Sequence, residues 1–160
     1  MWIEREIANF LSKNSQQRPA VLVTGARQTG KTSLLKHCFP ETPYVTLDQP
    51  LKARQVDENG EFFIEDNKPP VIIDEVQYAP NLFRFLKIHI DENRNKTGQF
   101  LLTGSQKFSL MKGVSESLAG RLSIINLYTL SARELGQHFK QKASSSQILD
   151  WIIKGGYPEI

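Results

Sequence analysis

The stretch Gly25-Ala26-Arg27-Gln28-Thr29-Gly30-Lys31-Thr32 determines how the rest of this 160-residue chain is interpreted. It follows the apolar run Ala20–Thr24 and precedes Lys31–Phe39, which has a helical composition ended by prolines. The stretch matches the pattern GxxxxGK followed by serine or threonine without a mismatch. Its two glycines allow backbone angles that a Cβ forbids, so successive backbone N–H groups can point at one anion. A strand, this turn and a helix in succession therefore predict a phosphate-binding loop.

Each polar side chain of the loop has an expected role. Lys31 is expected to reach the β- and γ-phosphates of a nucleotide, and the Thr32 hydroxyl to ligate Mg²⁺. Arg27 is expected either to contact phosphate or to brace the loop. The residues expected to bind nucleotide are Gly25, Ala26, Arg27, Gln28, Thr29, Gly30, Lys31, Thr32, Ser33 and Asp74.

Two acidic residues directly follow an apolar strand in Val71-Ile72-Ile73-Asp74-Glu75. In P-loop nucleoside triphosphatases an acid at this point holds the magnesium environment opposite the loop hydroxyl, so Thr32 and Asp74 are the predicted metal residues. Glu75 is then the predicted general base, because a carboxylate near the γ-phosphate can accept a proton from the attacking water. The alternative is a polar strand end that faces solvent.

Two further segments offer residues for catalysis. The apolar run Phe100–Leu102 ends in Thr103-Gly104-Ser105, where Thr103, or else Ser105, is expected to contact the γ-phosphate or the water; a turn with a helix cap is the alternative. Arg121 is expected to act as a finger on ATP bound to a neighbouring subunit, or else to be a surface arginine or part of an ion pair. The predicted catalytic residues are Lys31, Glu75, Thr103 and Arg121.

Short apolar strands alternate with helices along the whole chain, which predicts a doubly wound α/β fold with a parallel sheet. Ligands of such sheets bind beyond the carboxyl ends of the strands. The predicted strands are Ala20–Thr24, Tyr44–Leu47, Val71–Ile73, Phe100–Leu102 and Leu122–Leu127. The predicted helices are Trp2–Lys13, Lys31–Phe39, pieces of Gln49–Asn67, Asn81–Asp91, Ser105–Gly120, a helix to about Lys140 that a Ser131–Glu134 capping box opens, and Gln147–Lys154 after a Ser144–Ser146 linker.

Composition narrows the class of protein further. The apolar runs are far shorter than the ~20 residues of a membrane span, and the N-terminus lacks the charge pattern of a signal peptide. A single cysteine, Cys38, forms no internal disulfide, which indicates a cytoplasmic location. The net charge of +3 is mild and scattered, unlike the concentrated basic face of a nucleic-acid reader. Asn95-Lys96-Thr97-Gly98 begins like a guanine-reading motif but lacks its aspartate, so ATP is predicted in preference to GTP.

The segments GARQTGKTSLL, VIIDEVQYAPNLF, FLLTGSQKF and SESLAGR, in this order, closely resemble a group of bacterial and archaeal AAA-domain ATPases. Those proteins pair an N-terminal ATPase core with a C-terminal domain of unknown function. The resemblance runs from about Trp2 to the end of the chain. It implies an AAA+ (ASCE) core with a five-stranded sheet of order 5-1-4-3-2 and with ATP and Mg²⁺ as cofactors. It also implies the roles already assigned to Lys31, Thr32, Asp74, Glu75, Thr103 or Ser105, and it matches Arg121 to the family's arginine before the fifth strand.

The resemblance also implies how the chain is divided. Residues 1–143 are expected to form the ATP-binding domain with its N-terminal helix, and residues 144–160 a linker and the start of a truncated second domain. The expected function is Mg²⁺-dependent ATP hydrolysis coupled to remodelling or regulation of a partner, with a homo-oligomer as one possibility. The alternative is a nucleotide-gated DNA- or protein-binding module with little turnover. A P-loop kinase is disfavoured, because Arg84, Arg94 and Arg121 are too dispersed for a lid.

Overall fold

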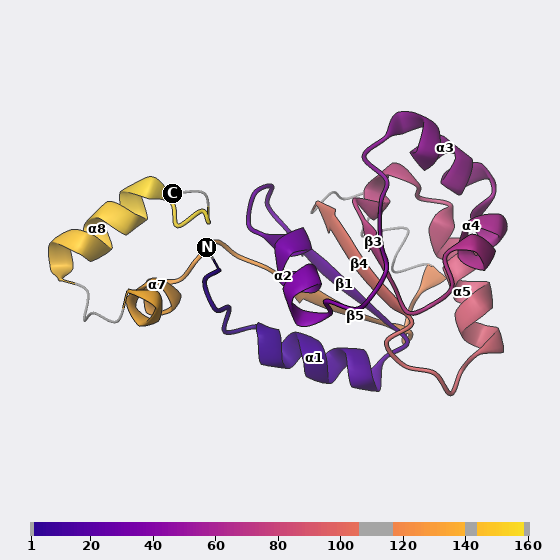
Figure 1. Ribbon diagram of the computed structural model, residues 1–160, viewed down its shortest axis with the longest axis horizontal. Helices are drawn as coiled ribbons and strands as arrows, with labels where there is room; N and C mark the ends of the chain where they lie inside the picture. The colour runs from indigo at the N-terminus through magenta and orange to yellow at the C-terminus, as the bar shows by residue number, and fades with distance from the viewer. Residues whose placement is uncertain (1, 106–116, 140–143, 159–160) are drawn as a thin grey trace.

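The computed structural model describes residues 2–105, 117–139 and 144–158. A central sheet is flanked by helices, and helices α7 and α8 extend from one end of this body (Figure 1). Residues 106–116, which make up most of the predicted Ser105–Gly120 helix, and Lys140 lie outside the described residues. Across the described residues, no helix combines the length and apolar composition that crossing a bilayer demands.

The sheet has five strands in the order β2-β3-β4-β1-β5, and every pair of neighbours is parallel. This is the predicted order 5-1-4-3-2 read from the other edge, so the predicted doubly wound fold is confirmed. The strands are β1 (Ala20–Gly25), β2 (Tyr44–Thr46), β3 (Val71–Asp74), β4 (Phe100–Ser105) and β5 (Leu122–Asn126).

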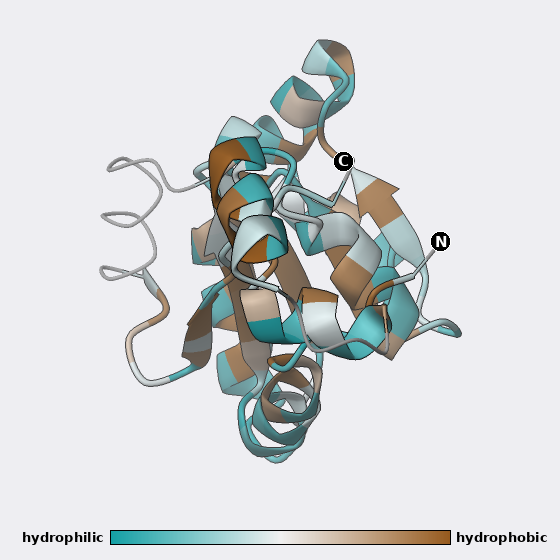
Figure 2. Cartoon of the chain, turned by 90° about the vertical axis from the view of Figure 1, so that its left-hand side faces the viewer, coloured by the Kyte–Doolittle hydropathy of each residue, from teal (hydrophilic) through white to brown (hydrophobic). Residues whose placement is uncertain are grey.

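Side chains of β1 alternate between two hydrophobic cores, as expected for a strand with both faces covered. Ala20 and Leu22 belong to the core that also contains residues of α3, α4 and α5. Val21 and Val23 belong to the core shared with α1 and α2. Figure 2 shows apolar strands in the interior and helices that turn hydrophilic residues outward. The two cores hold the sheet between its helical layers, and the parallel pairing of the strands brings all their carboxyl ends to one edge.

The described α-helices correspond to predicted helices and differ from them in some bounds, whereas the 3-10 helix η1 was not predicted. They are α1 (Ala8–Gln17), α2 (Lys31–Cys38), α3 (Pro50–Glu58), α4 (Gly60–Asp66), the 3-10 helix η1 (Val76–Tyr78), α5 (Leu82–Glu92), α7 (Ala132–His138) and α8 (Ser145–Lys154).

Three helix starts were predicted wrongly. Ser105, the predicted first residue of a helix to Gly120, is the last residue of strand β4. Helix α1 begins at Ala8 rather than Trp2, because hydrogen bonds of the buried Arg5 side chain hold the preceding segment in a non-helical course. Helix α8 begins at Ser145 rather than Gln147, because Ser144 and Gln147 form a capping box that makes the expected serine linker its first turn. The predicted capping box of Ser131 and Glu134 does open α7.

Candidate functional site

The loop from Gly25 to Thr32 joins the carboxyl end of β1 to the start of α2 and depends on its two glycines. Gly25 has φ +154°, and a Cβ on it would lie 2.2 Å from the carbonyl oxygen of Leu127. Gly30 has φ +87° and opens α2 in the left-handed region, which favours glycine. Gly25 is therefore required by the close approach of the segment after β5, and Gly30 is favoured by its left-handed backbone.

Lys31 points its ammonium group back into the loop. Its Nζ donates to the carbonyl oxygen of Ala26 at 2.7 Å and to that of Gly25 at 3.3 Å. Burial lowers the pKa of Lys31 below its ordinary value, although Glu75 and Asp74 oppose the shift. A partly desolvated cation surrounded by polar backbone atoms is well suited to a phosphate group.

Asp74 accepts hydrogen bonds from three hydroxyl groups on three different elements. Thr32 Oγ1 donates to its Oδ1 at 2.8 Å, Tyr44 Oη donates to its Oδ2 at 2.8 Å, and Thr103 Oγ1 also donates to Oδ1. The carboxylate is buried, and only 5% of Asp74 is exposed. The predicted pair Thr32 and Asp74 is thus in direct contact, with the oxygen donors that Mg²⁺ prefers.

Tyr44 is the member of this cluster that the sequence analysis missed. It comes from β2, which pairs with the strand that carries Asp74. Burial, with the hydrogen bond to Asp74, raises the pKa of Tyr44 to about 12, so its hydroxyl stays a donor at neutral pH. Lys36 Nζ lies 3.4 Å from the centre of the Tyr44 ring and holds it by a cation–π contact. The strand order expected from the family resemblance placed β2 beside β3. This order was the signal that could have brought Tyr44 near Asp74 in the sequence analysis.

Glu75 lies next to Asp74 with a left-handed backbone, φ 59° and ψ 44°. Its backbone N–H donates to Thr103 Oγ1 at 3.1 Å, and its carboxylate accepts from Gln77 Nε2. Thr103 is fully buried and makes its contacts with Asp74 and Glu75. Ser105, the alternative to Thr103, donates its N–H to Gln77 Oε1 at 3.2 Å, and its buried Oγ has no hydrogen-bond partner among the residues that the structure describes.

A cavity of about 590 Å³ opens over the loop. The lining residues from the loop, the start of α2 and the position after β3 are Arg27, Gln28, Gly30, Lys31, Thr32, Ser33 and Glu75. Its lining from segments remote in sequence comprises Trp2, Ile3, Arg5, Asp48, Tyr78, Leu130 and Pro158. Of the other predicted nucleotide residues, Thr29 is buried and donates its hydroxyl to the Ala26 carbonyl oxygen at 3.0 Å. A cavity of this size is typical of a small-molecule site.

Arg5 connects the loop to the chain on the far side of the cavity. It donates to the carbonyl oxygens of Thr29 at 2.9 Å and Tyr128 at 2.7 Å, and to Glu134 Oε1 at 3.0 Å. Burial alone would raise the pKa of Glu134, but hydrogen bonds from the N–H groups of Ser131 and Glu6 and from Arg5 outweigh it and lower that pKa. Arg5 was not predicted as a site residue, because it lies within the helix expected over Trp2–Lys13, beside the exposed acids Glu4 and Glu6.

Arg121 lies at the amino end of β5, whereas the loop follows the carboxyl end of β1. It makes a two-pronged ion pair with Asp91, with Nε–Oδ1 at 2.8 Å and Nη2–Oδ2 at 3.0 Å. Arg121 therefore sits at the opposite edge of the sheet from Lys31 of the same chain. The ion pair that the sequence allowed is present, and contact with ATP on a neighbouring subunit stays a prediction.

This sheet order, with a glycine-flanked loop between an inner strand and a helix, defines the chain as a P-loop nucleoside triphosphatase domain. A family profile described as an AAA domain matches residues 17–136, and the chain belongs to this family of ATPases. The predicted resemblance to AAA ATPases is thereby confirmed.

Curated relatives of similar sequence come from mycobacteria. The uncharacterized protein Rv2008c of Mycobacterium tuberculosis is 33% identical over 161 residues, which cover 99% of this chain and 34% of the relative. The uncharacterized protein Mb2031c of Mycobacterium bovis matches with the same figures. The chain thus spans about a third of the length of these relatives.

Solved structures of similar fold are also ATPases. The Walker-type ATPase of Pyrococcus abyssi aligns with a TM-score of 0.64 at 16% identity, covering 98% of this chain and 65% of that one. A signal transduction ATPase with a tetratricopeptide repeat sensor from Pyrococcus horikoshii aligns with a TM-score of 0.62 at 14% identity, covering 98% and 28%. At these identities the likeness concerns the fold alone.

Proposed function

We propose that this domain binds ATP with Mg²⁺ over the Gly25–Thr32 loop and hydrolyses it, with Glu75 as the general base. The observation that carries the proposal is the 2.8 Å contact between Thr32 Oγ1 and Asp74 Oδ1. It joins the loop hydroxyl to the strand carboxylate, and Thr32 lines the cavity together with Lys31 and Glu75. Such a juxtaposition is what a magnesium-dependent phosphate site requires.

Different residues of the chain would bind the phosphates, the metal ion and the base. The loop N–H groups and the Lys31 ammonium would hold the phosphates, while Thr32 and Asp74 would hold Mg²⁺. Bound Mg²⁺ would supply positive charge to the phosphate oxygens. Among the other residues that line the cavity, Trp2, Leu130 and Pro158 offer apolar surfaces that suit the flat face of a purine.

In the chemical step, Glu75 would be the proton acceptor. Water attacks the γ-phosphorus, its oxygen forms the new P–O bond, and the bond from phosphorus to the oxygen of ADP breaks. The Glu75 carboxylate accepts the proton that the water loses, and Lys31 stabilises the negative charge of the phosphates. The products are ADP and inorganic phosphate.

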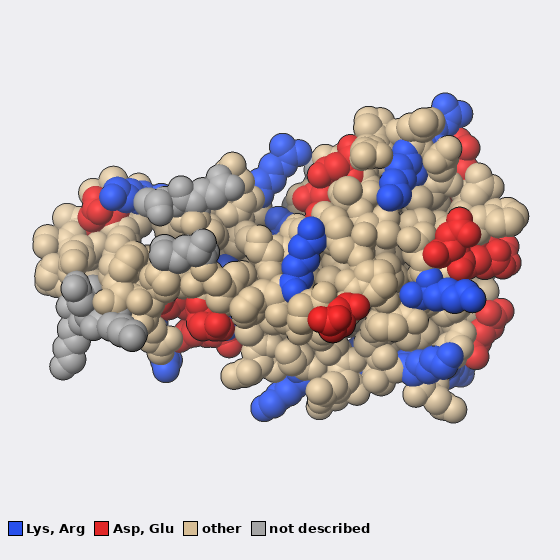
Figure 3. Space-filling model, in the orientation of Figure 1, with Lys and Arg blue, Asp and Glu red and all other residues tan. Residues whose placement is uncertain are grey.

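We also propose that hydrolysis is coupled to a partner, which would bind outside the nucleotide cavity. Support comes from the segment after α8, because the Leu130 N–H donates to the Gly156 carbonyl oxygen at 2.6 Å and Pro158 lines the cavity. A change at the phosphates thus has a short path to α7 and α8. Basic side chains on the face shown in Figure 3 are scattered among acidic and uncharged ones, so a protein partner is proposed before DNA.

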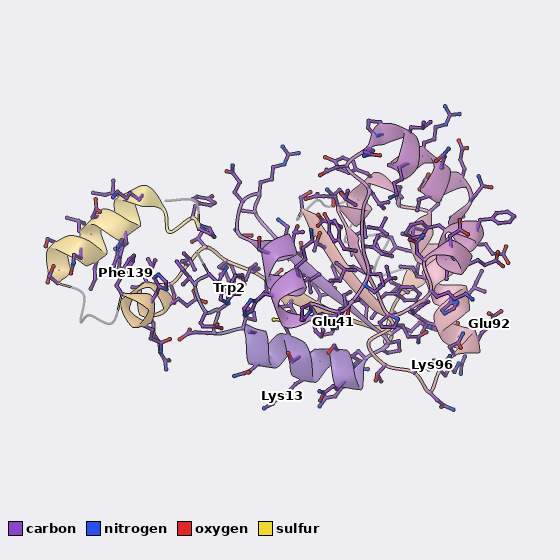
Figure 4. The ribbon with its side chains drawn as sticks, viewed as in Figure 1. Trp2, Lys13, Glu41, Glu92, Lys96 and Phe139 are labelled. Carbon is purple, nitrogen blue, oxygen red and sulfur yellow. The ribbon has the colours of Figure 1, made fainter. Side chains whose placement is uncertain are left out.

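The test measures ATP binding and phosphate release separately. Lys31→Ala should abolish binding of a fluorescent ATP analogue, and Glu75→Gln should keep binding but lower phosphate release at least about tenfold. Lys13→Ala and Glu41→Gln are the matched controls, because both side chains are exposed and lie away from the cavity (Figure 4). Normal binding by Lys31→Ala would refute the site. Tight binding by the wild-type chain without phosphate release, with and without DNA, would instead support the nucleotide-gated module.

A further inference from the structure

We infer that Gln77 is a positioning residue of the ATPase site, whose side-chain amide orients the Glu75 carboxylate and ties it to the end of β4. The inference rests on the proposed role of Glu75 as general base. It concerns a residue that lies two positions after Glu75 and outside the cavity lining.

The two ends of the Gln77 amide contact two different parts of the site. Its Nε2 donates to Glu75 Oε2, and its Oε1 accepts from the backbone N–H of Ser105 at 3.2 Å. A backbone N–H can only donate, so it fixes which end of the amide faces β4. The NH₂ end must then face Glu75, where an ionised carboxylate can only accept. The orientation of the Gln77 amide is therefore determined by its partners.

The backbone of Glu75 is held independently of its side chain. Its N–H donates to Thr103 Oγ1 at 3.1 Å, and Val76–Tyr78 form the 3-10 helix that follows. With its backbone held, Glu75 can still rotate about its side-chain torsions. The hydrogen bond from Gln77 to Oε2 restrains this rotation. The other carboxylate oxygen, Oε1, is left to accept a proton from water in the cavity that Glu75 lines.

The same amide places Glu75 in a continuous path from the phosphate loop. Ser105, which bonds to Gln77, pairs in the sheet with Gly25, the first residue of the loop. The path therefore runs from Gly25 at the end of β1 to Ser105, its partner on β4, and then through the Gln77 amide to Glu75. A general base must stay within hydrogen-bond reach of the water, so losing this restraint should cost rate rather than nucleotide affinity.

The kinetic test uses Gln77→Met, which keeps the length of the side chain and removes both hydrogen bonds. We expect kcat for ATP hydrolysis to fall about tenfold while KM for ATP stays within about twofold. Gln55→Met, on the exposed side of α3, is the matched control and should leave both constants unchanged. Unchanged kcat in Gln77→Met, or an equal rise in KM, would overturn the inference.

A double-mutant comparison tests whether Gln77 acts through Glu75. In a Glu75→Gln background, Gln77→Met should cause no further loss of turnover, because the group that it positions is already absent. A further tenfold loss in that background would overturn the inference and indicate a general structural role.

A readout that is independent of activity uses side-chain amide resonances of the protein without nucleotide. The Gln77 NH₂ signals, identified by their loss in Gln77→Met, should shift in Glu75→Ala and stay in place in Glu41→Ala. Unshifted signals in a chain that hydrolyses ATP would overturn the role of Gln77 alone. Absence of ATP hydrolysis in the wild-type chain would overturn the proposed hydrolysis and this role with it.

Discussion

Arg5 Nη1 donates a hydrogen bond of 2.9 Å to the carbonyl oxygen of Thr29, which joins the N-terminal segment directly to the phosphate loop. The same guanidinium bonds Tyr128 and Glu134, so one side chain connects the loop, the segment after β5 and helix α7. The ion pair between Arg5 and Glu134 is buried, and 6% of each side chain is exposed. A charge removed from such a pair leaves its partner desolvated and uncompensated.

Replacing Arg5 by methionine should therefore destabilise the fold by roughly 3–5 kcal/mol, measured as the free energy of unfolding in urea. Arg133→Met is the matched control, because Arg133 forms an exposed ion pair with Glu6 and should cost no more than about 1 kcal/mol. Equal effects of the two substitutions would show that the Arg5 contacts do not anchor the loop.

The lowered pKa of Glu134 makes stability depend on acid. Because the folded-state pKa lies below the ordinary value of 4.5, the ionised carboxylate stabilises the fold above that pH. This contribution should decline as the pH falls below 4.5 and through the lowered pKa. Urea unfolding measured from pH 7 to pH 3 should show the decline in the wild-type chain and a smaller one in Glu134→Gln. Parallel curves for the two would contradict the prediction.

Tyr44→Phe should weaken the use of magnesium. The substitution removes the hydroxyl that donates to Asp74 Oδ2 and leaves the ring under Lys36 in place. Groups that orient a metal ligand typically contribute about tenfold or more to metal affinity, so the Mg²⁺ concentration at half-maximal ATP binding should rise about tenfold. Tyr128→Phe serves as control, because the Tyr128 ring is 76% exposed and its contact with Arg5 uses the backbone oxygen.

Gly25→Ala should abolish nucleotide binding and destabilise the fold. The added Cβ would lie 2.2 Å from the Leu127 carbonyl oxygen, so either the loop or the segment after β5 must move. Gly120→Ala separates this clash from backbone strain, because Gly120 also has a positive φ, +75°, but no atom of the described part of the chain lies within 4 Å of its added Cβ. The control should cost about 1–2 kcal/mol and leave ATP binding intact. Normal ATP binding by Gly25→Ala would argue against the loop geometry.

The sequence was sufficient for those parts of the site that lie next to each other along the chain. The loop is one continuous motif, and Asp74 and Glu75 directly follow an apolar strand, so local pattern predicted both. The strand order came from the family resemblance, and it implied that the ends of β1, β3 and β4 meet. The Thr32–Asp74 contact follows from these facts together.

The parts that escaped prediction depend on contacts between distant segments. Arg5 was placed in a helix by apolar spacing that included Phe10, yet Phe10 is 55% exposed and the helix starts only at Ala8. Tyr44 and Gln77 belong to no motif, and their partners become neighbours only when the sheet and η1 form. A periodic pattern shows which residues share a helix face, but it does not show where a buried cation finds its acceptors.

Trp2 stacks on His37 with ring centres 4.0 Å apart and lines the proposed nucleotide cavity. The other of the two tryptophans, Trp151, lies on α8 and stacks on Phe139. Trp2 therefore lines the proposed nucleotide cavity, whereas Trp151 is not among the residues that line it. With Trp151 replaced by phenylalanine, the emission of Trp2 becomes a label-free optical signal, through which the filling and emptying of the cavity can be timed directly.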